Sequence, residues 1–299
     1  MKDSVPAIAV LGTGAMGAPV ARDLLRAGFC VRVWNRTPGK AASLVAQGAQ
    51  LASSPAEAAA GADVLITMLT DGSAVKSVMS GPAGAFRAFG ADAIWVQMST
   101  VGVEWSDRLA ELAGRHRVIF VDAPVSGSSD PAADGRLLIL AAGGGAVRSR
   151  LEPIFDVLGR RTVWLERVGD GSRLKLAINN WMAVTVQGIA ETLALAKILG
   201  LDADLLVDTI ADGPTASDYA IAKGVAMVDG NFIPGFPLRH AAKDAELAIQ
   251  AARLHDLRLP LTEALLPRWH EAIDDGHGAD DIASAITAVG GLPSSKAGP

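Results

Sequence analysis

The segment 7–34 constrains the fold of this chain more than any other. An uninterrupted apolar run at 7–11 leads directly into the glycine loop Gly12-Thr-Gly-Ala-Met-Gly17. Apolar runs of this length are typical of strands that are buried on both faces of a parallel sheet. A helical pattern at 18–27 and a second apolar run at 30–34 follow. The order of strand, glycine turn, helix and strand predicts the first unit of an α/β, doubly wound sheet.

The three glycines of this loop have the spacing of a dinucleotide-binding site. Gly12 permits a tight turn, Gly14 lets the backbone approach a pyrophosphate, and Gly17 allows the helix to pack closely on the strand. Backbone amides at the start of the helix then hold the phosphates. An incidental glycine turn is the alternative, but the complete strand-turn-helix-strand context favours a dinucleotide. The predicted cofactor contacts in this loop are Gly12, Thr13, Gly14, Ala15, Met16 and Gly17.

The end of the second strand predicts which dinucleotide binds. NAD sites usually carry an acidic residue there, whereas NADP sites carry a group such as arginine that accommodates the 2′-phosphate. This chain has Asn35-Arg36-Thr37 at that position and no acidic residue from 27 through 56. A guanidinium can give a phosphate two hydrogen bonds. We therefore predict NADPH as the cofactor in preference to NADH; the alternative is that Arg36 is merely solvated in a loop.

Further apolar runs, with helical segments between most of them, continue the alternation. A doubly wound sheet binds ligands beyond the carboxyl ends of its strands. Short hydroxyl side chains and glycines follow three of the runs, at Leu69-Thr70, at Ser99-Thr100 and at 123–128. Such groups suit an anionic small molecule, although serine, threonine and glycine are also the ordinary residues of loops. The predicted strands are 63–69, 93–98, 118–121, 137–142 and 162–165.

A long helical pattern over 172–199 separates this half of the chain from a half that is helical only. Lys175 and Asn179 lie four residues apart in it, a spacing at which side chains share one helical face. We predict two domains, 1–166 and 167–299, joined by this helix, with the pair facing the cleft between them, a common place for a ligand. The further predicted helices are 202–211, 216–228, 239–257, 261–275 and 279–289.

Composition excludes several classes of function. The net charge of −5 and the sequence pI near 5.5 give no basic footprint for nucleic acid. No apolar run reaches the ~18 residues needed to span a bilayer, and the amino-terminal residues lack a signal-peptide pattern, so we predict a cytoplasmic protein without a membrane partner. Cys30 is the single cysteine, which we expect in the core, and the histidines show no ligand spacing. No metal site is predicted.

Several stretches together resemble the β-hydroxyacid dehydrogenase family over nearly the whole chain. That resemblance implies a Rossmann-type NADP-binding domain, then an all-helical domain for substrate and dimerisation, joined by a long helix. It also implies a homodimer or homotetramer that acts as an NAD(P)-dependent dehydrogenase or reductase on CH–OH groups. The stretches, in chain order, are 12–17, 34–37, Ser99-Thr100, Asp122-Ala-Pro-Val-Ser-Gly127, Gly169-Asp-Gly-Ser-Arg-Leu-Lys-Leu-Ala-Ile-Asn-Asn180 and Lys243-Asp244.

The resemblance also implies roles for the residues of the site. Lys175 would be the general acid, giving a proton to the carbonyl oxygen as hydride arrives from the nicotinamide, and Asn179 would hold that oxygen or the lysine. Lysine has an ordinary pKa of ~10.4 and is therefore protonated at neutral pH, which suits that direction. The substrate, a small carboxylate-bearing aldehyde or hydroxy acid, would contact Ser126, Gly127, Ser128, Thr100, Phe236 and Asp244. Besides the glycine loop, the cofactor would contact Asn35, Arg36, Thr37, Met68, Leu69, Thr100 and Lys243.

Two of these assignments have ordinary alternatives. Phe236 lies in a loop punctuated by proline and glycine at 229–237, where it could simply be a packing residue. Lys243 and Asp244 lie near the start of a helix, where a solvated charge pair is common.

Within the family, 124–142 and 234–244 resemble the glyoxylate and succinic semialdehyde reductases in particular. Ser128 and Pro131 stand where hydroxyisobutyrate dehydrogenases typically have glycine, and Gln97 stands where many relatives have an acid. We therefore predict NADPH-dependent reduction of glyoxylate and succinic semialdehyde. The alternatives are a family member acting on 3-hydroxyisobutyrate or tartronate semialdehyde, an imine reductase, and a non-catalytic NADPH-binding protein. Lys175 argues against an imine reductase, because imine reductases generally lack this lysine. The presence of both Lys175 and Asn179 argues against a non-catalytic protein.

Overall fold

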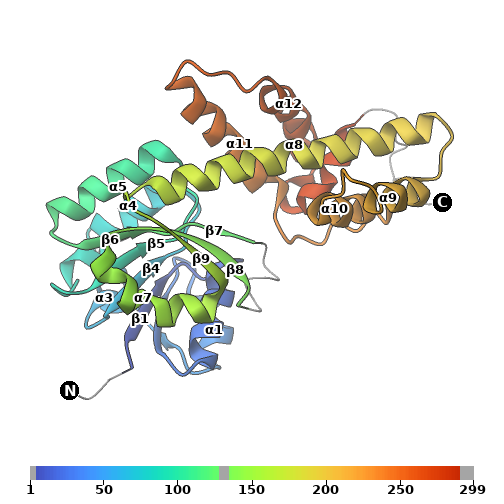
Figure 1. The fold of residues 1–299 in the computed structure, drawn as a ribbon. Helices are drawn as coiled ribbons and strands as arrows, with labels where there is room; N and C mark the ends of the chain where they lie inside the picture. Colours follow the sequence, from blue (N-terminus) through green and yellow to red (C-terminus); the bar gives the residue numbers. More distant parts are fainter. Residues whose placement is uncertain (1–4, 128–134, 290–299) are drawn as a thin grey trace. The chain divides into compact units, whose positions relative to one another are not determined.

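The computed structural model of the chain describes residues 5–127 and 135–289, which form two compact units (Figure 1). The first unit is Met1–Lys175 and the second is Leu176–Pro299. The domain boundary was predicted after residue 166, whereas the first compact unit extends to Lys175. The boundary between functional domains stays a prediction. Within the described residues, no helix combines the length and the apolar character that crossing a membrane requires.

A nine-stranded sheet forms the centre of the first unit. Its order is β3-β2-β1-β4-β5-β6-β8-β7, and β9 pairs with β8. The pairs from β3 to β6 are parallel, and so is β8 with β9, whereas β8 is antiparallel to β6 and β7. The strands are β1 (Ala7–Leu11), β2 (Cys30–Trp34), β3 (Gln50–Leu51), β4 (Val64–Thr67), β5 (Ile94–Gln97), β6 (Ile119–Asp122), β7 (Val125–Ser126), β8 (Leu137–Ala142) and β9 (Gly159–Leu165).

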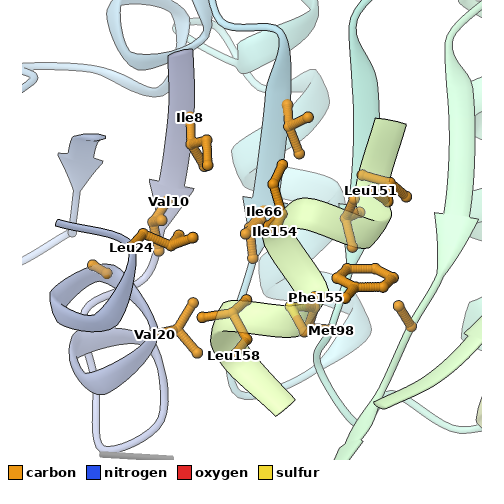
Figure 2. Close-up of a cluster of buried hydrophobic side chains, with 14 of the residues drawn as sticks. Ile8, Val10, Val20, Leu24, Ile66, Met98, Leu151, Ile154, Phe155 and Leu158 are labelled. Atoms are coloured by element: carbon orange, nitrogen blue, oxygen red, sulfur yellow. The ribbon is translucent and has the colours of Figure 1, made fainter. Parts of the chain in front are cut away.

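Helices cover both faces of this sheet, because its central strands are apolar on both faces. Ile8 and Val10 of β1 belong to a core that also holds Val20 of α1 and Phe155 of α7 (Figure 2). Ala9, on the opposite face, belongs to a second core with residues of α3, α4 and α5. The helices are α1 (Gly17–Arg26), α2 (Ala42–Val45), α3 (Pro55–Ala59), α4 (Gly72–Ser80), α5 (Val103–Arg115) and α7 (Gly145–Leu158), with 3₁₀ turns η1 (Pro38–Ala41) and η2 (Ala85–Arg87).

The second unit is built from helices and contains no strand among its described residues. Helix α9 packs on α10, and α11 packs on α12 (Figure 1). The core includes Trp269 of α12 and Val186 of α8, both fully buried. The elements are the part of α8 (Asp170–Ile198) that follows Lys175, then α9 (Ala203–Ala211), α10 (Asp218–Val228), α11 (Leu238–Arg253), α12 (Pro260–Asp274), η3 (His277–Ala279) and η4 (Ile282–Ala288).

The predicted fold class, a Rossmann-type sheet with a helical carboxyl-terminal part, is confirmed, with three local corrections. The predicted helix at 279–289 consists of the 3₁₀ segments η3 and η4. Cys30 is exposed rather than in the core, because it is the first residue of β2 and does not lie on the covered part of that strand. The sheet is not wholly parallel, because β8 runs antiparallel to β6 and to the short strand β7, which the sequence pattern did not reveal.

Candidate active site

The glycines of the loop between β1 and α1 have different structural reasons to be glycine. Gly12 has a φ of +104°, and a Cβ there would lie 2.2 Å from the carbonyl oxygen of Met68. A Cβ at Gly17 would lie 1.9 Å from the carbonyl oxygen of Gly12. At Gly14, by contrast, a Cβ would meet none of the described heavy atoms within 4 Å. Packing therefore requires the first and third glycines, while the second leaves open space beside the loop.

Polar groups around this space are suited to an anion. The first turn of α1 contains no acidic residue, and no side chain caps it. The backbone N–H of Thr13 donates to Oδ1 of Asn35 at 3.1 Å, and Nδ2 of Asn35 donates to the carbonyl of Thr37 at 3.0 Å. The hydroxyl of Thr13 is buried and has no hydrogen-bond partner among the described atoms. Free amides of a helix start and an unpartnered hydroxyl fit the phosphates of a dinucleotide.

Arg36 is the second residue after β2 and is exposed. Since the chain has no acidic residue from 27 through 56, no neighbouring carboxylate in that segment competes for its guanidinium. Asn35 is partly buried and joins this segment to the glycine loop through its bond to Thr13. The ends of β1 and β2 therefore carry hydrogen-bond donors, and the segment 27–56 carries no carboxylate that would accept from a ribose hydroxyl.

A buried hydrogen-bond network fixes the carboxyl ends of β4 and β5. Oε1 of Gln97 accepts from the backbone N–H of Ser99 at 2.8 Å, and Nε2 donates to the Ser99 carbonyl at 2.8 Å. The hydroxyl of Ser99 accepts from the N–H of Leu69 at 2.8 Å. An ionised acid could not make both bonds to Ser99, because a carboxylate only accepts. The network holds the backbone next to Met68, Leu69 and Thr100.

The end of β6 anchors the first turn of α8. Asp122 is fully buried, and its carboxylate accepts from the backbone N–H and from the hydroxyl of Ser172, both at 2.7 Å. A Cβ at Gly171 would lie 2.3 Å from the Leu140 carbonyl oxygen, so the helix start lies directly against the sheet. Burial raises the pKa of the Asp122 carboxyl to about 6, although its hydrogen bonds to Ser172 favour the ionised form.

Lys175 follows this anchor within the same helix and is the last residue of the first unit. It is 7% exposed. Ser126 lies in β7, and Gly127 follows it with a φ of +136°. The predicted substrate residue Ser128 lies outside the described residues.

In the second unit, Asn179 of α8 and Asp244 of α11 form a buried pair. Nδ2 of Asn179 donates to Oδ2 of Asp244 at 2.6 Å, and the residues are 2% and 3% exposed. Lys243 reaches the other carboxylate oxygen of Asp244 at 3.0 Å. Since a carboxylate only accepts, the hydrogen bond between Asn179 and Asp244 requires the amide nitrogen of Asn179 to face Asp244. The amide oxygen of Asn179 is buried and has no hydrogen-bond partner among the described atoms.

The alternative that Lys243 and Asp244 form an ordinary solvated charge pair does not hold, because Asp244 is almost fully buried. Phe236 is partly buried, and it packs on the core of the second unit. The alternative that Phe236 is an ordinary packing residue is therefore consistent with the contacts of its side chain. Whether Phe236 also contacts a substrate stays a prediction.

The structure brings some predicted residues together and adds others. Gly12 lies against the backbone carbonyl of Met68. Thr13 is hydrogen-bonded to Asn35, and Asn179 is hydrogen-bonded to Asp244. Asp122, Ser172 and Gln97 were not among the predicted site residues, although an acid at the end of a buried strand is a signal that could have identified Asp122. No group of three or more His, Cys, Asp or Glu side chains among the described residues could hold a metal ion.

Comparisons with known proteins agree with this arrangement. Residues 7–166 match the family model of the NAD binding domain of 6-phosphogluconate dehydrogenase. Residues 169–289 match the model described as NAD-binding of NADP-dependent 3-hydroxyisobutyrate dehydrogenase. A glyoxylate/succinic semialdehyde reductase 1 of Arabidopsis thaliana is 36% identical over 282 residues, which cover 94% of this chain and 98% of that protein.

Solved structures give the same result. A Mycobacterium tuberculosis 3-hydroxyisobutyrate dehydrogenase structure with L-serine is 28% identical, with a TM-score of 0.87, and the match covers 96% of this chain and all of that one. A 3-hydroxyisobutyrate dehydrogenase from Salmonella typhimurium is 26% identical with a TM-score of 0.84, covering 94% of this chain and 99% of that one. These matches confirm the resemblance found in the sequence motifs: the chain belongs to the β-hydroxyacid dehydrogenase family, whose members are NAD(P)-dependent oxidoreductases acting on CH–OH groups.

Proposed function

We propose that this protein reduces short aldehyde-acids, glyoxylate and succinic semialdehyde first, to the corresponding hydroxy acids with NADPH. The observation that carries the proposal is a buried lysine, Lys175, in a helix whose first turn is anchored to the sheet by Asp122 and Ser172. A buried ammonium in a fixed helix is suited to deliver a proton to one place. The names of the Arabidopsis relatives support the substrate class.

The preference for NADPH rests on the end of β2. Arg36 is exposed there, and no acidic residue occurs from 27 through 56 to repel a phosphate. The open space at Gly14 and the unpartnered Thr13 hydroxyl would receive the pyrophosphate. When bound, a reduced nicotinamide supplies the hydride that the carbonyl carbon of the substrate receives.

The chain's own residues would handle the proton. Lys175 would donate a proton to the substrate carbonyl oxygen, which becomes the hydroxyl oxygen of the product. The buried amide oxygen of Asn179 would accept a hydrogen bond from that ammonium, four residues earlier on the same helical face. An amide oxygen cannot donate to a carbonyl, so of the two roles predicted for Asn179 this orientation favours holding the lysine. Ser126 and Gly127 would bind the substrate carboxylate.

Consumption of NADPH, followed at its absorbance maximum with a panel of aldehyde-acids and cyclic imines, tests the proposal. We expect turnover with glyoxylate and succinic semialdehyde, little with imines, and a lower kcat/KM with NADH. Lys175→Ala should lower kcat by about 10²–10⁴-fold while the affinity for NADPH, measured by fluorescence titration, stays nearly unchanged.

Lys175→Arg is the matched variant, because it keeps the positive charge but donates a proton poorly. It should lose most of the turnover as well. Retained turnover in both variants would remove Lys175 from the mechanism. Faster turnover of 3-hydroxyisobutyrate or tartronate semialdehyde than of the two named substrates would reassign the protein within its family.

We also propose a homodimer or homotetramer. The support is a set of exposed apolar side chains near the end of α8 and in α9, where Ile198 and Leu205 are 70% and 62% exposed. Light scattering coupled to size-exclusion chromatography tests this, and a monomer at micromolar concentration would contradict it.

A further inference from the structure

The loop that carries Phe236 joins α10 to α11 and has little regular structure of its own. The side chain at residue 233 is 80% exposed, and Pro237 forms an isolated β-bridge with Asp281. A loop of this kind takes its conformation from whatever its backbone is bonded to. Phe236 is therefore held in place by contacts from outside the loop.

The carboxylate of Asp281 supplies those contacts. Oδ2 accepts from the backbone N–H groups of Gly235 and Phe236, both at 3.0 Å. Oδ1 accepts from Nζ of Lys223 at 2.6 Å and from the N–H of Ala283 at 3.0 Å. One oxygen thus binds the loop, while the other is held by α10 and by the helical turn that Asp281 itself caps.

The backbone on either side of Asp281 strengthens the same connection. The N–H of Asp281 donates to the carbonyl of Phe232 at 3.0 Å, and the N–H of Ile282 donates to the carbonyl of Phe236 at 2.8 Å. Asp281 is only 2% exposed, and Lys223, its ion-pair partner, has a side chain 15% exposed. Solvent screens such a pair little, and hydrogen bonds to a charged group are stronger than neutral ones.

We propose that Asp281 is a positioning residue that sets substrate selectivity by fixing Phe236 through two backbone amides. The inference rests on the proposed function and on the predicted contact of Phe236 with the substrate. An apolar ring can distinguish aldehyde-acids by the methylene groups between their two carbonyl carbons. Glyoxylate has none and succinic semialdehyde has two, so the longer substrate depends on the position of the ring.

Two variants separate positioning from folding. Asp281→Asn keeps the size of the side chain but cannot accept at both ends. Asp281→Ser can still cap η4, since serine is a good cap, but is too short to reach the amides of Gly235 and Phe236. Trp269→Phe is the matched control: it removes a buried hydrogen bond to Gln187 in the same unit and none of the hydrogen bonds that hold the loop.

We expect the Asp281 variants to raise KM for succinic semialdehyde roughly fivefold to tenfold and KM for glyoxylate less than about twofold, with kcat nearly unchanged. Phe236→Ala should do the same, and Asp281→Ser should add nothing further in the Phe236→Ala background, because both changes remove one effect. Trp269→Phe should leave the ratio of the two KM values unchanged. Equal changes for both substrates, or full additivity with Phe236→Ala, would overturn the proposal.

Hydrogen exchange at the amides of Gly235 and Phe236 gives a readout that does not need turnover. Exchange should be faster in both Asp281 variants than in the wild type and in Trp269→Phe. Unchanged exchange overturns the positioning role whatever the activity. If the wild type reduced neither substrate, the proposed function would fail, and this measurement would still decide whether Asp281 holds the loop.

Discussion

Nδ2 of Asn179 donates a 2.6 Å hydrogen bond to Oδ2 of Asp244, and both side chains are buried. The bond decides which end of the amide is available for chemistry. The nitrogen is engaged with an acceptor-only group, which leaves the amide oxygen as the free atom. Asp244 thereby orients Asn179, although the two residues are far apart in sequence.

The first prediction concerns this pair. Asn179→Asp places two carboxylates in contact, which should lower the free energy of unfolding by about 1–3 kcal/mol, since one of them must lose its hydrogen bond or its charge. Adding Asp244→Asn restores a donor and an acceptor at the same two positions, and thermal unfolding should return close to the wild-type midpoint. The value of kcat should stay about tenfold or more below the wild type, because a carboxylate would hold the Lys175 proton more tightly.

Circular dichroism melts and steady-state kinetics on the two single variants and the double variant check this. A double variant that regained both stability and kcat would mean that the orientation of the Asn179 amide is irrelevant to turnover. A double variant that regained neither would mean that the pair is not interchangeable in this site.

The second prediction uses the contrast between two glycines of one loop. Gly17→Ala inserts a Cβ 1.9 Å from the Gly12 carbonyl oxygen, so it should destabilise the protein by about 1–3 kcal/mol, the usual cost of overpacking. Gly14→Ala meets no described atom within 4 Å and should leave the unfolding midpoint almost unchanged. It should nevertheless raise the Kd for NADPH by about tenfold, because the methyl group occupies the space proposed for the pyrophosphate.

Thermal melts without cofactor and fluorescence titration with NADPH measure both effects. Each variant is the control for the other. Wild-type NADPH affinity in Gly14→Ala would show that the pyrophosphate does not approach this loop.

The third prediction concerns cofactor preference. Arg36→Ala should raise KM for NADPH by about 10–100-fold, because it removes hydrogen bonds to a charged group, and should change KM for NADH less than about threefold. Arg26→Ala is the control. Arg26 carries an exposed guanidinium in the same unit, and it is the last residue of α1, at the end of that helix away from the glycine loop. The Arg26→Ala variant should change neither value. An equal loss with both cofactors in Arg36→Ala would argue against binding of the 2′-phosphate by this residue.

The fold could be predicted wherever it depends on local pattern. The segment 7–34 contains a strand, a turn, a helix and a strand within a few dozen residues, and its apolar runs identify β1 and β2 with the bounds that the structure gives. The helix predicted over 172–199 corresponds to α8 within two residues at each end. Strand β7 could not be found in this way, because two residues are too few to show a period.

The contacts that support the candidate site are long-range and left little trace in the sequence. Asp281 binds the amides of Gly235 and Phe236, which no spacing rule connects to it. Asp122 bonds Ser172 across the intervening β7, β8, α7 and β9. Residues that we propose to face a ligand were predicted through motifs, whereas residues that hold other residues became visible only with the tertiary structure.

The last prediction concerns Asp122 and pH. Burial raises the pKa of its carboxyl from 3.8 to about 6, so the folded state binds the proton more tightly than the unfolded state. The corresponding contribution to stability is fully present below pH ~3.8 and is lost as pH rises through about 6, on the order of 3 kcal/mol in all. Asp122→Asn removes the titration, and its amide can still bond the backbone and the hydroxyl of Ser172. Denaturant unfolding of both proteins at pH 5 and pH 8 should therefore show the wild type losing stability relative to Asp122→Asn as pH increases. The opposite slope would mean that the hydrogen bonds from Ser172 outweigh burial and that this carboxyl is ionised at low cost.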